Sequence, residues 1–90
     1  MLDISVIIPV YNGSKTIKKL YQELTKILKK NSKSYEILFV DDSSNDKSFN
    51  IISDICKKDK SVTGILLSKN YGQHNAIYCG FQNSKGKYII

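Results

Sequence analysis

The chain has 90 residues, a formal net charge of +6 at pH 7, 41% hydrophobic residues and 24% charged residues. This length corresponds to one small domain or to part of a larger one, and no apolar run approaches the roughly 20 residues of a membrane span. These values exclude a multi-domain chain and a membrane-spanning one. Because no secretion signal is recognisable at its start, the chain is expected to be cytosolic.

The positive charge comes entirely from lysine, because the sequence contains no arginine. Lysine is a hydrated point charge, whereas proteins that read nucleic acids and phosphates favour the planar arginine fork. The lysine-rich surface therefore favours solvent or an anionic lipid surface over base-specific nucleic-acid recognition. Cys56 and Cys79 form no Cys-x-x-Cys pair, and both are predicted to be buried, reduced thiols.

The first predicted elements are a strand and a helix. Ile4 to Ile8 is a β-branched run that predicts a strand, and this strand is expected to stop at Pro9, which lacks the N–H of a central strand. A turn over residues 12–14 leads into a helical pattern. The apolar stripe expected for this helix consists of Ile17, Leu20, Tyr21, Leu24, Ile27 and Leu28.

The second pair of elements follows the same order. Tyr35 to Val40 predicts a strand, and its lack of polar alternation is typical of a parallel strand buried on both faces. Asp46 is expected in or just before the first turn of the next helix, where a negative charge is favourable. The apolar stripe of that helix consists of Phe49, Ile52, Ile55 and Cys56.

The remaining pattern predicts a third strand at Val62 to Leu67, a short helix from Gly72 that ends at Gly86, and a fourth strand at Tyr88 to Ile90. Alternating strands and helices predict a parallel sheet with right-handed crossovers. The expected fold class is therefore α/β, a Rossmann-like three-layer α/β/α arrangement with a parallel sheet.

Polar residues follow three of the predicted strands. They lie at residues 9–12, at Asp41 and Asp42, and at residues 68–70. In open parallel sheets, ligands bind in the crevice beyond the carboxyl ends of the strands. The sequence therefore predicts a ligand site at this edge.

The residue types at this edge are suited to a nucleotide. Tyr11 offers an aromatic face for stacking, Asp42 an acceptor for an imide or ribose donor, and Lys69 a cation for phosphate oxygens. Gly13 and Gly72, near helix starts, would let a phosphate approach free backbone N–H groups.

Each of these residues also has a purely structural interpretation. Tyr11 and Asn12 could form only a turn, and Lys69 could be an ordinary surface lysine. The paired acids could cap the next helix, although one acid suffices and two adjacent like charges repel each other. His74 is more often a solvent-facing or packed imidazole than a catalyst.

Two longer motifs carry a family resemblance. Residues 5–12, followed by residues 36–46, resemble the start of the family 2 inverting glycosyltransferases, which have the GT-A nucleotide-sugar-binding fold. Residues 67–77, with Gly80 and Phe81, look like the branch that moves sugars onto polyprenyl phosphates, including dolichol-phosphate mannosyltransferases and bacterial undecaprenyl-phosphate glycosyltransferases.

The resemblance covers the whole chain, but only the first part of the family's catalytic domain. Residues 1–90 are therefore expected to be a single partial domain, the nucleotide-binding half, with the rest of the catalytic domain and any carboxy-terminal membrane helices outside it. Alone, the chain is expected to bind nucleotide without turning over sugar.

The resemblance also implies roles for individual residues. Pro9, Tyr11 and Asn12 would line the nucleotide pocket. Asp42 would accept a hydrogen bond from the base, typically uracil, and Asp41 would support the same wall.

Further along the chain, Lys69, Asn70 and Gly72 would complete the nucleotide site. Lys69 stands where relatives often carry arginine, so a bidentate grip on the diphosphate is not expected there. Mg²⁺ or Mn²⁺ would be held by an Asp-x-Asp motif expected just after Ile90, so neither a metal ligand nor a catalytic residue is expected within the chain.

The resemblance implies transfer of a sugar, with inversion, from a UDP-linked or similar nucleotide sugar to a lipid-phosphate or glycan acceptor. The expected acceptor is a polyprenyl phosphate of cell-envelope synthesis. The metal would neutralise charge on the leaving nucleoside diphosphate. The full-length protein is expected in the cytoplasm at the inner face of the membrane. No nucleic-acid partner is expected, and the open sheet edge could support self-association.

Two other functions stay open at this point. A dinucleotide-dependent oxidoreductase would also use an acid after its second strand, but residues 9–14 contain one glycine and no GxGxxG motif. A non-catalytic basic domain could bind membrane or nucleic acid through its lysines, and such binding would be salt-sensitive.

Overall fold

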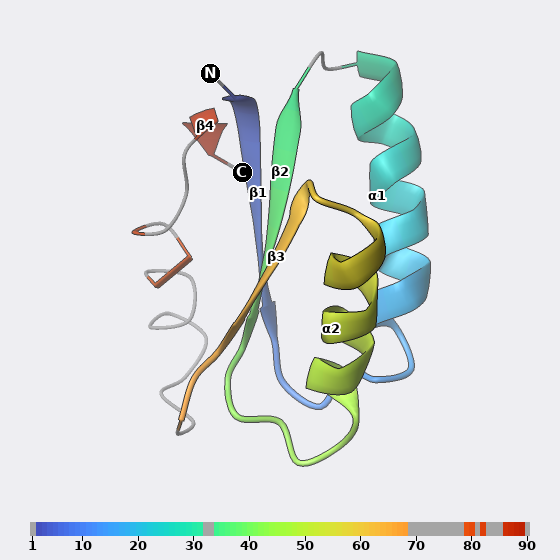
Figure 1. Ribbon diagram of the computed structural model, residues 1–90, viewed down its shortest axis with the longest axis vertical. Coiled ribbons are helices and arrows are strands. Elements are labelled where there is room, and N and C mark those ends of the chain that lie inside the picture. Colours follow the sequence, from blue (N-terminus) through green and yellow to red (C-terminus); the bar gives the residue numbers. More distant parts are fainter. Residues whose placement is uncertain (1, 32–33, 69–78, 81, 83–85, 90) are drawn as a thin grey trace.

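The computed structural model describes residues 2–31, 34–68, 79–80, 82 and 86–89. The strands form one parallel sheet in the order β3-β2-β1-β4, so the predicted α/β class is confirmed. Figure 1 shows β1, β2 and β3 ending at the lower edge, with the loops that lead to α1 and α2, while β4 lies at the upper edge beside the start of β1. The elements are β1 (Leu2–Val10), α1 (Ile17–Asn31), β2 (Tyr35–Asp41), α2 (Ser48–Lys58), β3 (Val62–Leu66) and β4 (Gly86–Ile89).

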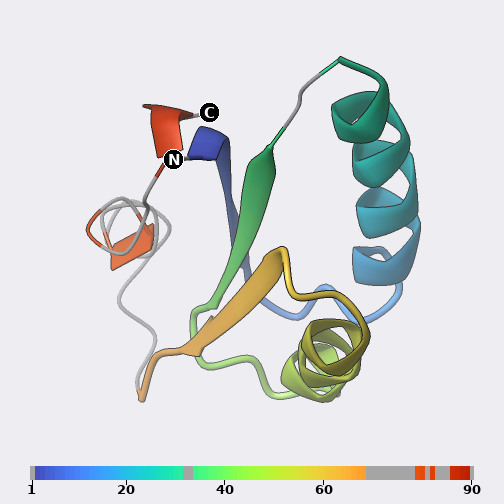
Figure 2. The ribbon, with the colours of Figure 1, turned by 45° about the horizontal axis from the view of Figure 1, so that its top comes forward.

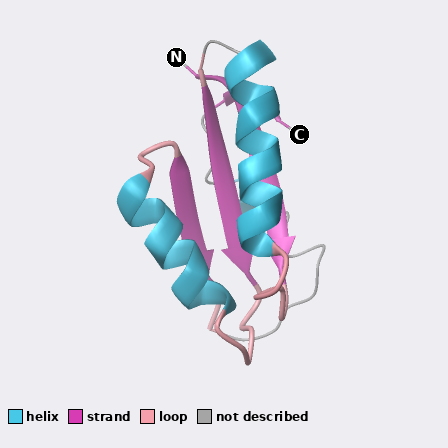
Figure 3. Cartoon of the chain, turned by 90° about the vertical axis from the view of Figure 1, so that its right-hand side faces the viewer, coloured by secondary structure: helices cyan, strands magenta, loops and turns pink. Residues whose placement is uncertain are grey.

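The two faces of the sheet are covered by different segments of the chain. Helices α1 and α2 lie side by side on one face (Figures 2 and 3). On the opposite face, a Cβ added to Gly80 would lie 2.4 Å from Ile7 Cγ2 and 3.2 Å from Val40 Cγ2, so this glycine lets the backbone approach the sheet closely. The helix predicted from Gly72 falls largely outside the described residues.

Strand β2 provides the centre of the core. Ile37 and Phe39 point toward the helices, and Leu38 and Val40 point to the other face; all four side chains are buried. The prediction that this strand is covered on both faces is therefore confirmed. Buried residues from four other elements, β1, α1, α2 and β3, pack with Ile37 and Phe39 in this core: Val6, Val10, Ile17, Leu28, Ile52, Ile55 and Val62.

The buried stripe of α1 differs from the predicted one. Leu20 and Ile27 are 42% and 57% exposed, while Thr25 is buried and its hydroxyl donates to the Tyr21 carbonyl at 2.9 Å. At 3.6 residues per turn, Thr25 lies on one flank of the helix, and Leu20 and Ile27 lie on the other. The Thr25 flank faces α2, so contact between the helices decides which flank is covered.

Strand β1 continues through Pro9 to Val10, and the prediction that it stops at Pro9 was wrong. The Val10 carbonyl accepts from the Asp42 N–H at 2.8 Å, so in this alternating ladder Val10 points toward β2 and Pro9 points toward β4. The described pairing with β4 runs only from Leu2 to Ser5. The missing N–H of Pro9 therefore falls where the described ladder has no partner for it.

The later strands shift slightly from their predicted bounds. β3 ends at Leu66, one residue earlier than expected, and β4 starts at Gly86 instead of Tyr88. Gly86 was predicted to end the preceding helical unit, but it pairs opposite Leu2 in the sheet.

No helix in the described part of the chain has both the length and the apolarity needed to cross a membrane.

A hydrogen bond links α1 to the residue that follows α2. The Tyr21 hydroxyl donates to Asp59 Oδ2 at 2.5 Å, and this hydrogen bond, together with burial, raises the pKa of Tyr21 to about 12.

Cys56 and Cys79 are free, as predicted, but both are half-buried instead of buried. Burial raises the pKa of the Cys56 thiol, which keeps it protonated and unreactive near neutral pH.

The strand order also marks the ligand-binding edge. The chain builds β1, β2 and β3 outward in one direction and then returns to place β4 on the other side of β1. The switch point therefore lies beside β1, and ligands of open α/β sheets bind outside the carboxyl ends at such a point.

Candidate functional site

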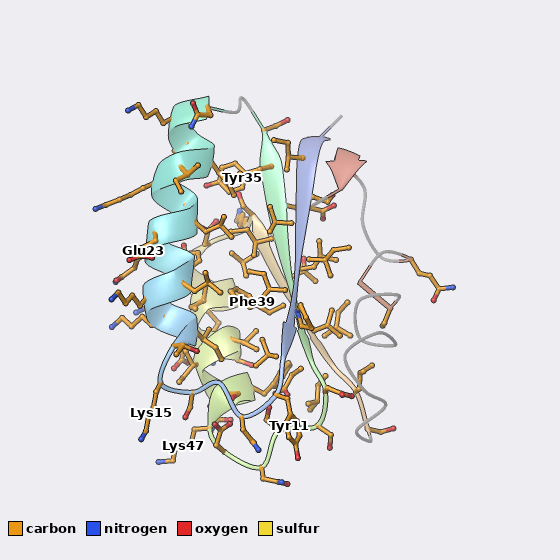
Figure 4. All side chains as sticks on the ribbon, turned by 180° about the vertical axis from the view of Figure 1, so that it is seen from behind. Tyr11, Lys15, Glu23, Tyr35, Phe39 and Lys47 are labelled. Atoms are coloured by element: carbon orange, nitrogen blue, oxygen red, sulfur yellow. The ribbon has the colours of Figure 1, made fainter. Side chains whose placement is uncertain are left out.

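The predicted site residues near the ends of β1 and β2 lie at one edge of the sheet. Val10 pairs with Asp41, so both strands finish at the same level. Tyr11 follows β1 and is 50% exposed, and Figure 4 shows it at this edge. The predicted residues Lys69, Asn70, Gly72 and His74 lie outside the described residues.

The two acids at the end of β2 differ in accessibility. Asp41 is fully buried, whereas Asp42 keeps 4% of its surface exposed. Both acids are thus buried, and Asp42 is the slightly more accessible of the two. The Oδ2 atom of Asp41 is buried and has no hydrogen-bond partner among the described residues.

The loop after β1 and the loop after β2 are joined by a set of cross-loop hydrogen bonds, here called the loop clasp. Three backbone N–H groups of the first loop donate to side chains of the second, and one N–H donates in the opposite direction. The bonds are Asn12 N to Ser44 Oγ (2.8 Å), Gly13 N to Ser48 Oγ (2.9 Å), Ser14 N to Asp46 Oδ2 (3.1 Å) and Asn45 N to Asn12 Oδ1 (2.8 Å).

Each serine of the loop clasp is itself held by an acid. The Ser44 hydroxyl donates to Asp41 Oδ1 at 2.5 Å, and the Ser44 N–H donates to the same oxygen at 2.9 Å. In the same way, the Ser48 hydroxyl and N–H both donate to Asp46 Oδ1. Each serine hydroxyl donates its proton to an acid, which leaves the oxygen oriented to accept an N–H from the facing loop. The two acid–serine pairs are therefore arranged in the same way.

Capping of the second helix falls to neither Asp41 nor Asp42. Asp46 accepts the backbone N–H of Ser48, the first residue of α2, and its negative charge lies at the positive end of the helix. The predicted position of Asp46 is therefore confirmed, and the alternative that the paired acids only cap the helix is wrong. Asp41 instead closes the turn through Ser44.

The hydrogen bonds to Asp46 predict an acid-dependent stability. The Ser48 hydroxyl, with the N–H groups of Ser48 and Ser14, lowers the pKa of Asp46 to about 2 from its ordinary 3.8. Because the folded-state pKa is depressed, the stabilisation is present above pH 3.8 and is lost as the pH falls toward 2. We expect Asp46→Asn to reduce the difference in urea midpoint between pH 5 and pH 2.

The matched control for that experiment is Asp54→Asn, which changes an exposed acid of α2 outside the loop clasp. It should leave the pH dependence close to that of the unchanged chain. An Asp46→Asn chain that loses as much stability on acidification as the unchanged chain would contradict the prediction.

The cavities of the described residues do not single out the candidate site, and these residues gather no metal ligands. A cavity of about 360 Å³ lies between α1 and α2, with Tyr21 and Ile55 in its wall, away from the strand ends. A smaller one of about 200 Å³ lies between the end of β1 and the start of α1, with Pro9, Tyr11 and Gly13 in its lining but neither Asp41 nor Asp42. Within the described ranges, no three His, Cys, Asp or Glu residues gather closely enough to hold a metal ion.

Comparison with known proteins decides the family. Residues 5–90 match Glycosyl transferase family 2. The chain belongs to this family. The family resemblance of the sequence is therefore confirmed, and a family 2 glycosyltransferase is favoured over both the oxidoreductase and the non-catalytic basic domain.

Curated family 2 relatives include undecaprenyl-phosphate 4-deoxy-4-formamido-L-arabinose transferases. The one from Enterobacter sp. (strain 638) is 42% identical over 88 residues, which cover 97% of this chain and 27% of the relative. The one from Shewanella sediminis (strain HAW-EB3) is 41% identical with the same coverage. The chain thus spans about a quarter of the length of these relatives.

Solved structures agree with the family 2 assignment. S. aureus TarS 1-349 superposes with a TM-score of 0.83 at 26% identity, over 99% of this chain and 26% of that chain. The crystal structure of TarS 1-349 in complex with UDP-GlcNAc has the same TM-score and identity, over 99% of this chain and 25% of that chain. The family 2 chain described here therefore has the GT-A, Rossmann-like fold of these neighbours.

Sequence reasoning missed the two serines of the loop clasp. The spacings Asp41-x-x-Ser44 and Asp46-x-Ser48 are typical of turns in which a side chain bonds to nearby backbone. That signal could have predicted the contacts within the second loop. It could not have predicted the bonds to Asn12 and Gly13, which depend on the register of β1 against β2.

Proposed function

We propose that this chain supplies the nucleoside-binding part of a glycosyltransferase that moves a sugar from a UDP-linked donor to a polyprenyl phosphate. Its curated relatives are named for transfer to undecaprenyl phosphate, and a solved neighbour is bound to UDP-GlcNAc. The cell-envelope role, the donor and the acceptor follow from these likenesses. The 90 residues form the nucleotide-binding part of a larger catalytic domain.

The observation that carries this proposal is the pairing of Tyr11 and Asp42 at the ends of adjacent strands. β1 and β2 finish level, so an exposed aromatic ring and a carboxylate lie at the same edge, beside the switch point of the sheet. A ring can stack on a base, and a carboxylate accepts from a base N–H. Together, the ring and the carboxylate can recognise a nucleoside through its base.

The charge on Asp42 selects among the bases. Uracil presents an N–H at N3, which donates to a carboxylate, whereas cytosine presents a bare N3 lone pair that the carboxylate repels. A site built to accept a substrate N–H discriminates strongly against an analogue that lacks it. Asp42 therefore favours uridine over cytidine nucleotides.

The other predicted residues have supporting roles in this proposal. Pro9 and Asn12 shape the wall beside Tyr11, and Asp41 holds Ser44 behind Asp42. Lys69, Asn70 and Gly72 are assigned to the phosphate side of the nucleotide from the sequence.

The metal of the complete enzyme is assigned to residues beyond this site. Asp41 is buried and bonded to Ser44, and the described part of the chain gathers no set of metal ligands. The residues at hand therefore do not fit a Mg²⁺ or Mn²⁺ site. The Asp-x-Asp motif predicted after Ile90 remains the proposed holder.

The proposed location is the cytoplasmic face of the cell membrane, where a polyprenyl-phosphate acceptor would present its head group. The exposed lysines of α1 and α2 are compatible with an anionic lipid surface.

Calorimetric titration of this chain with UDP and with CDP tests the proposal. We expect saturable UDP binding and CDP binding at least tenfold weaker, because at N3 only uracil carries a proton to donate to Asp42. No sugar transfer is expected from this chain with UDP-sugar and Mn²⁺. Equal affinity for both nucleotides, absence of UDP binding, or NADH binding that UDP does not compete would contradict the proposal.

A further inference from the structure

We propose that Ser44 and Ser48 are positioning residues that fix the distance between Tyr11 and Asp42, so that the nucleoside pocket is formed before the nucleotide arrives. This inference rests on the proposed function, since it assigns the loop clasp to the same site. Neither serine contacts the nucleotide in this proposal. Each acts through the backbone of the loop that carries a recognition residue.

The backbone of both loops shows why a clasp is needed. Tyr11 is followed by Asn12 with φ of 53°, and Asp42 is followed by Ser43 with φ of 60°. Both residues are in the left-handed region, which is unfavourable for most residues other than glycine, although Asn tolerates it better than Ser. Each recognition residue therefore sits directly before a bend that its loop would not adopt alone.

Ser44 joins the two bends. Its oxygen accepts from the Asn12 N–H at 2.8 Å while its hydroxyl donates to the buried Asp41 Oδ1 at 2.5 Å. The carboxylate orients the hydroxyl, and a hydrogen bond to an ionised acceptor is stronger than a neutral one. Loss of the Ser44 hydroxyl would release the left-handed Asn12 and with it the neighbouring Tyr11.

Ser48 repeats this arrangement one residue further along the first loop. Its buried hydroxyl donates to Asp46 Oδ1, and its oxygen accepts from the Gly13 N–H at 2.9 Å. The second pair anchors the first loop to the start of α2, a rigid element. Two parallel bridges restrain both translation and rotation of one loop against the other.

The clasp acts on the loops and leaves the sheet independent of it. Its bonds all lie beyond Val10 and Asp41, where the β1–β2 ladder ends. The ladder and the buried core remain when the clasp is lost. A variant without the clasp should therefore stay folded and bind nucleotide less tightly, because the two loops must then be ordered during binding.

The decisive experiment compares Ser44→Ala, Ser48→Ala and Ser44→Thr in the whole chain. Calorimetry well below the unfolding temperature measures the Kd for UDP, and amide hydrogen exchange measures protection at Asn12 and Gly13. We expect each alanine variant to weaken UDP binding about five- to tenfold, as expected for loss of the one bond that reaches across to the first loop. Exchange should quicken at Asn12 in Ser44→Ala and at Gly13 in Ser48→Ala.

Two controls separate positioning from general stability. Ser44→Thr keeps the hydroxyl and should restore the Kd, and Ser53→Ala changes a half-buried serine of α2 outside the clasp and should leave the Kd unchanged. If the alanine variants lose unfolding temperature but keep the Kd, the positioning role is overturned. Ser48→Ala and the exchange data keep the test decisive if Ser44→Ala does not fold.

Failure of this inference differs from failure of the proposed function. If the unchanged chain does not bind UDP, the proposed function is overturned and the positioning role falls with it. If the unchanged chain binds UDP and the alanine variants bind it equally well, the function stands and only the role of the serines is overturned.

Discussion

Replacement of Asp42 with alanine is expected to weaken UDP binding by about 10- to 100-fold. The carboxylate accepts the N3 proton of uracil in our proposal, and a hydrogen bond to a charged group contributes about 1.5–3 kcal/mol, where 1.4 kcal/mol is tenfold. Both adjacent acids are buried, and Asp42, the slightly more accessible of the two, is the one assigned to the base. Calorimetric titration with UDP measures the weakening.

A second substitution at this position reports on base selection. Asp42→Asn keeps the shape of the side chain, removes its charge and adds an amide that can donate to N3 of cytosine. We therefore expect the preference for UDP over CDP to narrow in this variant. The matched control is Asp54→Ala, which removes an exposed acid of α2 and should leave UDP binding unchanged. Unaltered UDP affinity in Asp42→Ala would contradict the assignment.

Replacement of Phe39 with alanine is expected to lower the free energy of unfolding by about 3–5 kcal/mol. Phe39 is fully buried at the centre of β2, and Figure 4 shows its ring between the sheet and the helices. Truncation removes the largest fully buried side chain and leaves a cavity that neighbours fill only in part. Because the total free energy of unfolding of a native protein is only about 5–15 kcal/mol, Phe39→Ala should remove much of it.

Urea unfolding followed by circular dichroism measures this loss. Phe39→Leu keeps most of the volume and should cost far less, and Phe49→Ala, at a half-buried position of α2, should be intermediate. A Phe39→Ala chain as stable as the Phe39→Leu chain would show that the core of β2 does not hold the sheet. Since Asp41 and Asp42 end the same strand, loss of this core would also remove the site.

The edge of the sheet that carries the site was predictable from local residues. The apolar run of β2 and the two acids that end it are contiguous, so strand and site residues were visible together. The membership in Glycosyl transferase family 2 followed from the same motifs. What could not be predicted was the burial of both acids, because it depends on the packing around them and not on their neighbours in sequence.

The covered flank of α1 is a second case. Periodicity alone placed Leu20 and Ile27 in the buried stripe, because each falls within one turn of the apolar face. The direction in which a helix leans is set by the element that packs beside it, here α2. The proline of β1 is similar: its effect depends on which neighbouring strand its missing N–H would have faced.

By itself, the sequence determined the alternation of strands and helices, the parallel sheet, and the nucleotide-type residues that follow its strands. These features depend on residues a few positions apart. Tertiary structure alone decided the loop clasp, whose bonds join residues 32 to 35 positions apart. Such contacts exist only once the register of β1 against β2 brings the two loops level, and that register is decided where two strands distant in the sequence meet.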